Sequence, residues 1–267
     1  MPQVLMEDKE TVAVLRLANG VTNAIGAELV DELSAAVGTV RSRGQGLVLA
    51  GNRKFFSIGL DVPELLDYDR DAMADFWNRF EDLVLALYTL PAPTACAICG
   101  HATGGGAILA LACDYRFMAE GKRLVALNEV QIGVPVPYLA DLMLRQIVSD
   151  RVAVELEFCS GFLGPHAAKA AGLADGVCDE QAVEDAAVER IRAVAGMPRL
   201  AFTLTKQHRT REIPSRFSAI RQELNQAFMD CWFSPAAQGL LREAAEKFYG
   251  GEGCERSSAL IPSRPVS

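Results

Sequence analysis

The sequence predicts an α/β fold that continues into a helical C-terminal region, and three observations lead to this fold class. Short apolar runs alternate with longer helical patterns over about the first 137 residues. Strand, helix and strand at this spacing are usually joined by parallel crossovers. Beyond that point the patterns are almost all helical, and the 267 residues, 50% of them hydrophobic, are enough to bury a large core.

Apolar periodicity predicts the first elements. The run from Val12 to Leu17 is typical of a strand, and Asn19-Gly20 after it is a turn signal. Residues 26–43 predict a helix with one buried face, because apolar side chains recur every three or four positions: Leu29, Val30, Leu33, Val37 and Val40. Gly44-Gln45-Gly46 ends this helix, and residues 47–50 predict a short apolar strand.

The middle of the chain continues the alternation. Residues 76–90 predict a long helix that stops at Pro91-Ala92-Pro93. A strand over 94–99, a compact helix over 105–113 and a strand over 115–119 follow.

The remaining segments predict helices at 138–147, 152–159, 165–171, 183–194, 198–208, 215–231 and 235–249. We therefore expect residues 1–195 to form a core that carries the active site. Residues 196–267 should form the helical C-terminal region, and its tail, residues 254–267, is rich in Pro and Ser and is expected to be disordered.

Charge and hydropathy exclude several classes of partner. A net charge of -8 and a pI near 5.0 argue against a nucleic-acid-binding protein, which needs a basic face. The longest apolar stretch, residues 94–113, contains His101 and four glycines, so no membrane span is expected. The charged segment 7–10 lies close behind Met1 and does not resemble a secretory signal, which predicts a cytoplasmic protein.

The cysteines and histidines predict neither disulfides nor a metal site. Seven cysteines, an odd number scattered through apolar runs, are typical of a reducing compartment. Cys96 and Cys99 lie within a predicted strand, with no second pair and no nearby histidine to complete a metal site. The three histidines lie far apart and have no nucleophile beside them, and the glycine run lacks the dinucleotide-binding pattern.

Two glycine turns are candidates for a site that binds negative charge. Gly59 can adopt a conformation that points the N–H of Leu60 into a cavity. Gly104-Gly105-Gly106 opens an apolar helix whose first N–H groups can stabilise an anion. The same glycines could instead serve only to pack this helix tightly, and Asp61 with Glu64 matches a helix N-cap as well as a catalytic position.

A glutamate completes the pattern, because Leu127-Asn128-Glu129 places a carboxylate at the end of a later strand. In combination and order, these motifs resemble the enoyl-CoA hydratase/isomerase, or crotonase, superfamily over roughly the first 250 residues. Asn23-Ala24-Ile25 resembles its coenzyme A-contacting turn, residues 56–61 its first oxyanion segment, and residues 104–106 its second. The resemblance implies a crotonase-type spiral of β-β-α turns with a helical C-terminal oligomerisation region.

The resemblance also implies roles for individual residues. The catalytic groups would be the Glu129 carboxylate as base and the N–H groups of Leu60 and Gly105 as the oxyanion hole. The substrate-binding residues would be Ala24, Phe56, Ser57, Ile58, Gly59, Asp61, Ile108, Asn128 and Lys247. Lys54 and Lys247 stand where the family places contacts to the adenine and the 3′-phosphate, although a solvated lysine is the simpler interpretation of each.

Ile108 distinguishes this chain from the hydratases of the family. Hydratases usually have two catalytic glutamates, and Ile108 stands at the position of the first of them. The remaining Glu129 segment is similar to Δ3,Δ2-enoyl-CoA isomerases, where one carboxylate removes a proton from C2 and returns it to C4. This favours an isomerase, with a hydratase, decarboxylase, thioesterase or non-catalytic acyl-CoA-binding member as alternatives. The expected substrate is an acyl-CoA thioester, with coenzyme A as part of the substrate and no separate cofactor or metal. A homotrimer or a dimer of trimers is the assembly that the resemblance implies.

Overall fold

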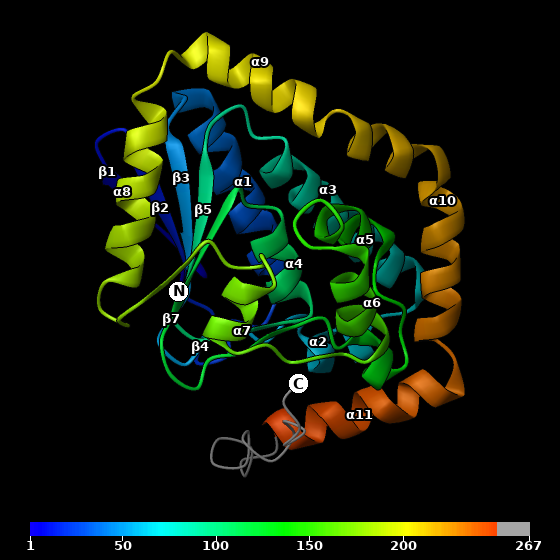
Figure 1. The fold of residues 1–267 in the computed structure, drawn as a ribbon. Coiled ribbons are helices and arrows are strands. Elements are labelled where there is room, and N and C mark those ends of the chain that lie inside the picture. The colour runs from blue at the N-terminus through cyan, green and yellow to red at the C-terminus, as the bar shows by residue number, and fades with distance from the viewer. Residues whose placement is uncertain (250–267) are drawn as a thin grey trace.

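The structure is a computed structural model that describes residues 1–249. It is an α/β fold, as predicted, in which long helices surround a central sheet (Figure 1). The segment 254–267, which we expect to be disordered, lies outside the described residues. Within residues 1–249, no helix combines the length and the hydropathy needed to cross a membrane.

The larger sheet has six strands in the order β1-β2-β3-β5-β7-β9. β1 and β2 pair antiparallel, and every other pair in this sheet is parallel. β3 and β5 are buried along their whole length, as expected for strands covered on both faces. The strands are β1 (Val4–Lys9), β2 (Val12–Leu17), β3 (Gly46–Ala50), β5 (Thr94–Ile98), β7 (Tyr115–Ala119) and β9 (Gly176–Cys178).

A smaller sheet of three parallel strands carries the site. Its order is β4-β6-β8, with β4 (Phe55–Ser57), β6 (His101–Thr103) and β8 (Val125–Ala126). Each of these strands follows a strand of the larger sheet and precedes a helical segment. The chain therefore repeats a β-β-α turn three times, which is the predicted spiral.

The larger sheet separates two apolar cores. On one face, α1 (Ala27–Arg43) and α3 (Arg70–Tyr88) pack in the main core with alternate strand residues such as Leu15 and Leu49. On the other face, α8 (Val183–Ala195) packs against the intervening residues, among them Val14 and Val48. Figure 1 shows these helices on opposite sides of the strands. The five apolar positions predicted for the inner face of α1 are all buried.

Short helices close the region around the smaller sheet. α2 (Val62–Leu66) begins at Asp61, whose side chain accepts a hydrogen bond from the N–H of Glu64 at 3.3 Å. Glu64 in turn accepts from the N–H of Ala27 at 3.1 Å, so it caps the start of α1. The others are α4 (Gly105–Leu111), the 3₁₀ helix η1 (Glu129–Ile132), α5 (Tyr138–Leu144), α6 (Asp150–Phe158) and α7 (Pro165–Ala170).

Three long helices form the C-terminal region: α9 (Arg199–Thr210), α10 (Glu212–Trp232) and α11 (Pro235–Tyr249). They run around the outside of the molecule and bring α11 beneath α2 (Figure 1). The buried Lys206 of α9 donates to Asp114 at 2.7 Å and to the carbonyl oxygen of Ala92 at 2.9 Å. Arg221 of α10 donates to Glu81 of α3 at 2.9 Å. Ion pairs therefore attach this region to the core.

The structure differs from the predicted elements in a few places. α3 begins at Arg70, six residues before the predicted start, because the Asp69 side chain accepts from the N–H of Ala72 at 2.8 Å and caps the helix there. β1 was not predicted, since none of its residues is fully buried and its apolar pattern is weak. β9 and the smaller sheet have strands of only two or three residues, which are too short for a period to be recognised.

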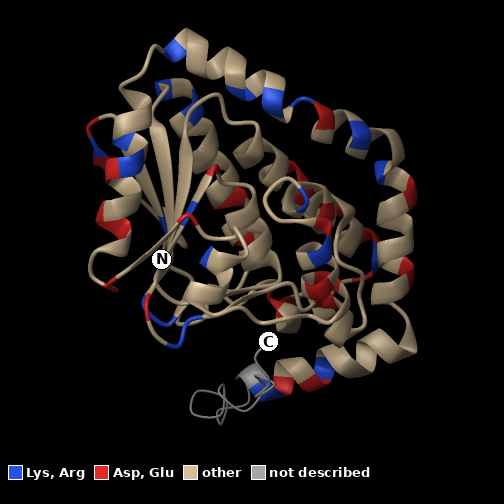
Figure 2. Ribbon diagram, viewed as in Figure 1, with Lys and Arg blue, Asp and Glu red and all other residues tan. Residues whose placement is uncertain are grey.

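Charges of both signs are mixed along two of the outer helices, α8 and α10, whereas α9 carries Lys and Arg without Asp or Glu. Figure 2 shows Lys and Arg interspersed with Asp and Glu on α8 and α10. Many are paired across elements, for example Arg16 of β2 with Glu184 of α8 at 2.6 Å.

Candidate active site

One cavity collects the turns that follow the three strands of the smaller sheet. The turn after β4 contributes Gly59 and Leu60, the turn after β6 contributes Gly104 and Gly105, and Glu129 follows β8. Because these strands are parallel, their carboxyl ends lie at the same edge of the sheet. Other lining residues are mostly apolar and come from α3, η1, α10 and α11: Trp77, Phe80, Ile132, Phe228, Trp232, Ala244 and Ala245.

The first turn requires glycine. Gly59 has a φ of 105°, and a Cβ there would lie 2.9 Å from the carbonyl oxygen of Thr103 and 3.2 Å from the nitrogen of Gly105. The turn is held by the Ser57 hydroxyl, which accepts from the N–H of Gly59 at 3.1 Å. The Thr103 hydroxyl also donates to the carbonyl oxygen of Ile58 at 2.7 Å. The backbone on either side of Leu60 is therefore fixed.

The second turn packs directly on the first. Gly104 has a φ of 51°, and Gly105 begins α4. A Cβ on Gly106 would lie 2.5 Å from the carbonyl oxygen of Ser57, so only glycine allows α4 to approach β4 this closely. The first N–H groups of a helix have no acceptor within the helix. The N-terminus of α4 is thus brought beside Gly59, at the cavity.

Glu129 is the one carboxylate among the described residues that line this cavity. It is 7% exposed, and neither of its carboxylate oxygens has a hydrogen-bond partner in the described part of the chain. Burial raises the pKa of Glu129 to about 7, with a smaller rise from the charge of Glu157 and a lowering by the backbone N–H of Glu129 itself. A carboxyl group with this pKa can both take up and release a proton near neutral pH.

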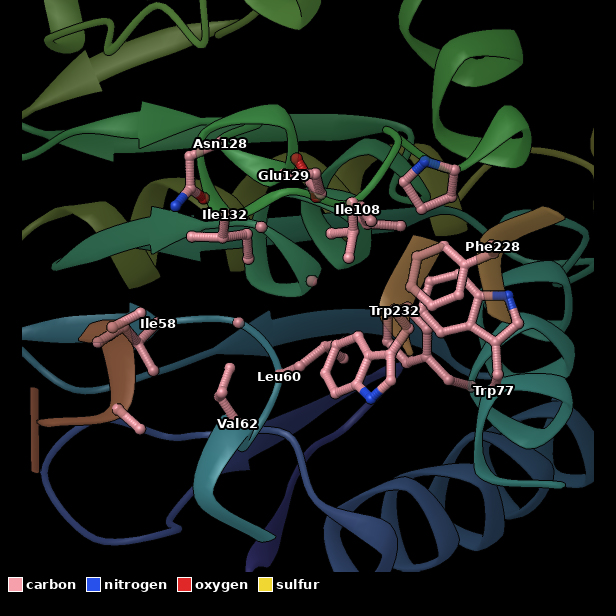
Figure 3. A pocket seen from close by; sticks show the side chains of 18 residues that line it. Ile58, Leu60, Val62, Trp77, Ile108, Asn128, Glu129, Ile132, Phe228 and Trp232 are labelled. Atoms are coloured by element: carbon pink, nitrogen blue, oxygen red, sulfur yellow. The ribbon is translucent and has the colours of Figure 1, made fainter. Parts of the chain in front are cut away.

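Ile108 and Asn128 flank Glu129 in Figure 3. Ile108 is 3% exposed, and it lies in the first turns of α4 with its side chain in the cavity. Asn128 precedes η1 and lines the cavity without capping that helix through its side chain. The apolar position that the sequence places at Ile108 therefore lies beside the buried carboxylate.

Three aromatic side chains close one end of the cavity and were not identified from the sequence. Trp77 of α3 stacks on Phe228 of α10 with 3.8 Å between ring centroids, and Trp232 lies one turn further along α10 (Figure 3). The Nε1 atom of Trp232 is buried without a partner in the described residues. Trp77 and Phe228 are 151 positions apart in the sequence, so no local spacing could have predicted their contact.

Some of the predicted substrate-binding residues do not line the cavity. Ala24 and Phe56 are buried behind it, and Asp61 caps α2. Burial raises the pKa of the Asp61 carboxyl. Lys247 lies on α11 and pairs with Glu243 at 3.7 Å. The structure brings together the other predicted residues, namely Ile58, Gly59, Leu60, Gly105, Ile108, Asn128 and Glu129, with Ser57 hydrogen-bonded behind them.

Asn23 attaches the segment 23–25 to the strand that precedes the first glycine turn. It is fully buried with a φ of 49°, and its amide nitrogen donates to the carbonyl oxygens of Phe55 and Phe56 at 3.1 Å each. Ile25 beyond it forms an isolated bridge with Leu60. Within residues 1–249, no group of three or more His, Cys, Asp or Glu side chains is placed to hold a metal ion.

Comparison with known proteins agrees with this geometry. Residues 7–245 match the family described as enoyl-CoA hydratase/isomerase. The human protein "Enoyl-CoA delta isomerase 1, mitochondrial" is 29% identical over 247 residues, which cover 91% of this chain and 82% of the human protein. A probable enoyl-CoA hydratase of Mycobacterium avium is 32% identical over 198 residues, which cover 73% of this chain and 76% of the relative.

Solved structures give the same result. The crystal structure of human mitochondrial delta3-delta2-enoyl-CoA isomerase superposes with a TM-score of 0.89 and 28% identity, over 94% of this chain and all of that one. An enoyl-CoA hydratase from Mycobacterium marinum superposes with a TM-score of 0.72 and 27% identity, over 85% of this chain and 96% of the other. The match therefore covers the sheets, the cavity and most of the C-terminal helices.

Proposed function

This chain belongs to the enoyl-CoA hydratase/isomerase family and has its crotonase-type fold, and we propose that it moves the double bond of an enoyl-CoA from Δ3 to Δ2. The observation that carries the proposal is that Glu129 has no second carboxylate beside it among the described residues of the cavity. It is the one carboxylate lining the described cavity, it is buried, and it faces two glycine turns that present backbone N–H groups. Isomerase relatives that cover most of the chain support the same activity.

In the proposed reaction, Glu129 removes a proton from C2 of the thioester and returns a proton to C4. Negative charge develops on the thioester oxygen as the C2 proton leaves, and the N–H groups of Leu60 and Gly105 would stabilise it. Loss of one such donor typically raises the barrier by about 3–4 kcal/mol. Both proton transfers use the same carboxylate, so no second acid or base is needed.

Ile108 supports isomerisation over hydration. A hydratase must hold and polarise a water molecule while a proton is added to the substrate, and a second carboxylate makes this easier. Here the buried side chain next to Glu129 is a branched hydrocarbon. Hydration is nevertheless the second candidate, because the mycobacterial relative bears the name of a probable hydratase.

The remaining assignments follow from the family. The substrate would be an acyl-CoA thioester, with Lys54 and Lys247 near its adenine and 3′-phosphate and no separate cofactor. A homotrimer or a dimer of trimers is the proposed assembly. A contact surface is offered by three exposed apolar residues, Met197 just before α9 and Leu200 and Leu204 on it. Light scattering of the purified protein tests the assembly. The six described cysteines are all unpaired, which fits the proposed cytoplasmic location.

The test is conversion of trans-3-hexenoyl-CoA to its 2-enoyl isomer, with hydration of crotonyl-CoA measured in parallel. We expect the purified protein to isomerise and to hydrate little. Glu129→Gln should lower kcat by about 10²–10⁴, because the base is removed while the shape is kept. Glu120→Gln, at an exposed glutamate, is the matched control. Hydration as the main activity, or full isomerase activity in Glu129→Gln, would refute the proposal.

The pH dependence of the isomerisation provides a second test. Glu129 must be ionised to accept the C2 proton, and its pKa lies at about 7. We therefore expect kcat/KM to rise with pH and to level off above about pH 7. A rate that is already constant from pH about 5, near the ordinary range of a glutamate, would show that another group acts as base.

A further inference from the structure

An acidic pair, Glu157 on α6 and Asp141 on α5, lies close to η1, the element that begins with Glu129. Glu157 of α6 is 9% exposed, and its Oε1 atom is buried without a partner among the described residues, as are both carboxylate oxygens of Glu129. α6 packs against η1, which begins at Glu129, and the charge of Glu157 acts on Glu129. Buried carboxyl oxygens that find no protein donor are usually satisfied by ordered water.

The carboxyl of Glu157 also interacts with solvent-facing groups. Burial raises the pKa of the Glu157 carboxyl, and the charge of Asp141 on α5 and a side-chain hydrogen bond with it raise this pKa as well. Asp141 accepts from Nε of Arg145 at 2.7 Å, and Arg145 is half-exposed. The charged groups around Glu157 are therefore Asp141 and Arg145 from α5 and Glu129 from η1. Glu81 of α3 lines the same second cavity as Glu157.

That cavity is separate from the catalytic one and opens to solvent. It has a volume of about 520 Å³, which is room for many water molecules, and Asp141, Arg145 and Glu157 all line it. Trp77, Pro137 and Phe228 line both cavities, so the two are neighbours divided by the stacked aromatic pair. Figure 3 shows this pair at the end of the catalytic cavity.

The elements that carry Glu129, Glu157 and Asp141, namely η1, α6 and α5, pack one against the next between the catalytic cavity and the second cavity. We propose that Glu157, acting with Asp141, exchanges the proton held by Glu129 for a proton from the water of the second cavity. The proposal rests on the proposed isomerisation. Protonated Glu129 gives its proton through a bridging water to Glu157, and a proton from Glu157 passes to Asp141 or to cavity water. The same steps in reverse return a solvent proton, so charge and proton number are unchanged.

The acidities of the two groups support this path. Burial and the neighbouring Asp141 raise the pKa of Glu157 to about 7, close to that of Glu129. Proton transfer between groups of matched pKa costs little free energy in either direction. Glu157 touches no substrate in this scheme, so it is a positioning residue that acts through Glu129.

Isomerisation of trans-3-hexenoyl-CoA in D₂O, stopped at low conversion, measures the exchange. Without exchange, the hydrogen taken from C2 returns to C4; with exchange, C4 of the product carries deuterium. We expect deuterium at C4 in the wild type and a several-fold lower deuterium content per turnover in Glu157→Gln. The glutamine amide keeps a hydrogen bond to Asp141 but cannot carry the proton. The deuterium content per turnover depends on the rate of exchange relative to the rate of proton return to C4. A structural defect that slows proton return would therefore raise the content, whereas loss of the relay lowers it.

Glu155→Gln is the matched control, because Glu155 lies on the same helix and pairs with Arg151 at the surface. It should give the wild-type deuterium content, whereas Asp141→Asn should lower it as Glu157→Gln does. A wild-type product without deuterium at C4 would overturn the proposal, since Glu129 would then return its proton directly. An unchanged deuterium content in Glu157→Gln would also overturn it.

Failure of the isomerisation itself can be distinguished from failure of the relay. If no variant and no wild-type protein isomerises the substrate, the proposed function is wrong. Infrared titration of the Glu129 carboxyl without substrate then tests the coupling alone. A lower midpoint for Glu129 in Glu157→Gln supports the link between the two groups, and an unchanged midpoint refutes it.

Discussion

Glu129 illustrates how burial, as the largest effect, raises the pKa of a carboxyl group to a value suited to proton transfer. Its carboxylate oxygens have no hydrogen-bond partner on another described residue, so the effect of burial on the charged form outweighs the small stabilisation from its own backbone N–H. The motif around it could be recognised from the sequence because its neighbours in the chain carry the pattern. Its pKa could not, because it depends on α6 and on aromatic side chains that come from distant helices.

Gly59 is the residue at which the addition of a single methyl group should lower the activity most. With a φ of 105°, its Cβ in Gly59→Ala would meet the Thr103 carbonyl oxygen at 2.9 Å and the Gly105 nitrogen at 3.2 Å. We expect the two turns to separate and kcat to fall by about 10²–10³, as when an oxyanion-hole donor is lost. Steady-state isomerase assays measure this.

Gly38→Ala is the matched control for that variant. Gly38 lies within α1, and a Cβ there would have no atom within 4 Å. Alanine in a helix interior should stabilise the protein by about 0.5–1 kcal/mol and leave the activity unaltered. Equal activity of Gly59→Ala and Gly38→Ala would show that the first turn has no part in catalysis.

At the level of elements, helices and strands with a regular spacing of apolar residues were predicted from the sequence, and elements without such a spacing were missed. The inner face of α1 and the bounds of β2 and β7 agree with the prediction, because apolar spacing is clear over those residues. The strands of the smaller sheet have two or three residues, and their places were marked only by the glycine turns after β4 and β6 and by the Glu129 segment after β8. The start of α3 was missed because an aspartate cap, outside the apolar stripe, sets it.

The attachment of α9 depends on one buried ion pair. Lys206 is 5% exposed and donates to Asp114 and to the carbonyl oxygen of Ala92, which lie next to β5 and β7. Lys206→Met would leave Asp114 without this cation, and we expect the free energy of unfolding to fall by about 3 kcal/mol. Urea denaturation measures the loss, and hydrogen exchange should locate it in α9.

The exposed Lys169 of α7 provides the comparison for that variant. Lys169→Met should change the free energy of unfolding by less than about 0.5 kcal/mol, as surface substitutions usually do. If both variants were equally stable, the contacts of Lys206 in α9 would contribute nothing to the stability of the fold.

For the whole molecule, the spiral of β-β-α turns explains why part of the active site could be predicted from the sequence. Each β-β-α turn delivers one segment to the same edge of the smaller sheet, so three short motifs far apart in sequence converge. The walls of the cavity come instead from α3, α10 and α11, whose residues are ordinary amphipathic helix positions in the sequence. Their role emerges only from how the C-terminal helices return to the core.

The buried base should also make the stability of the whole molecule depend on pH. The pKa of Glu129 is about 7 in the folded protein, against 4.5 for an unperturbed glutamate. The folded state therefore binds this proton more tightly, and its contribution to stability is complete below pH 4.5 and is lost as the pH rises through about 7. Over that interval it amounts to roughly 3 kcal/mol.

Glu129→Gln has no titrating carboxyl at this position. The difference in the free energy of unfolding between the variant and the wild type therefore reports the titration of Glu129 separately from that of all other groups. We expect the variant to gain roughly 3 kcal/mol in the free energy of unfolding relative to the wild type between about pH 4 and pH 8. Urea denaturation followed by circular dichroism at several pH values measures the difference. A difference that stays constant with pH would mean that the Glu129 carboxylate is as well solvated in the folded protein as in the unfolded chain.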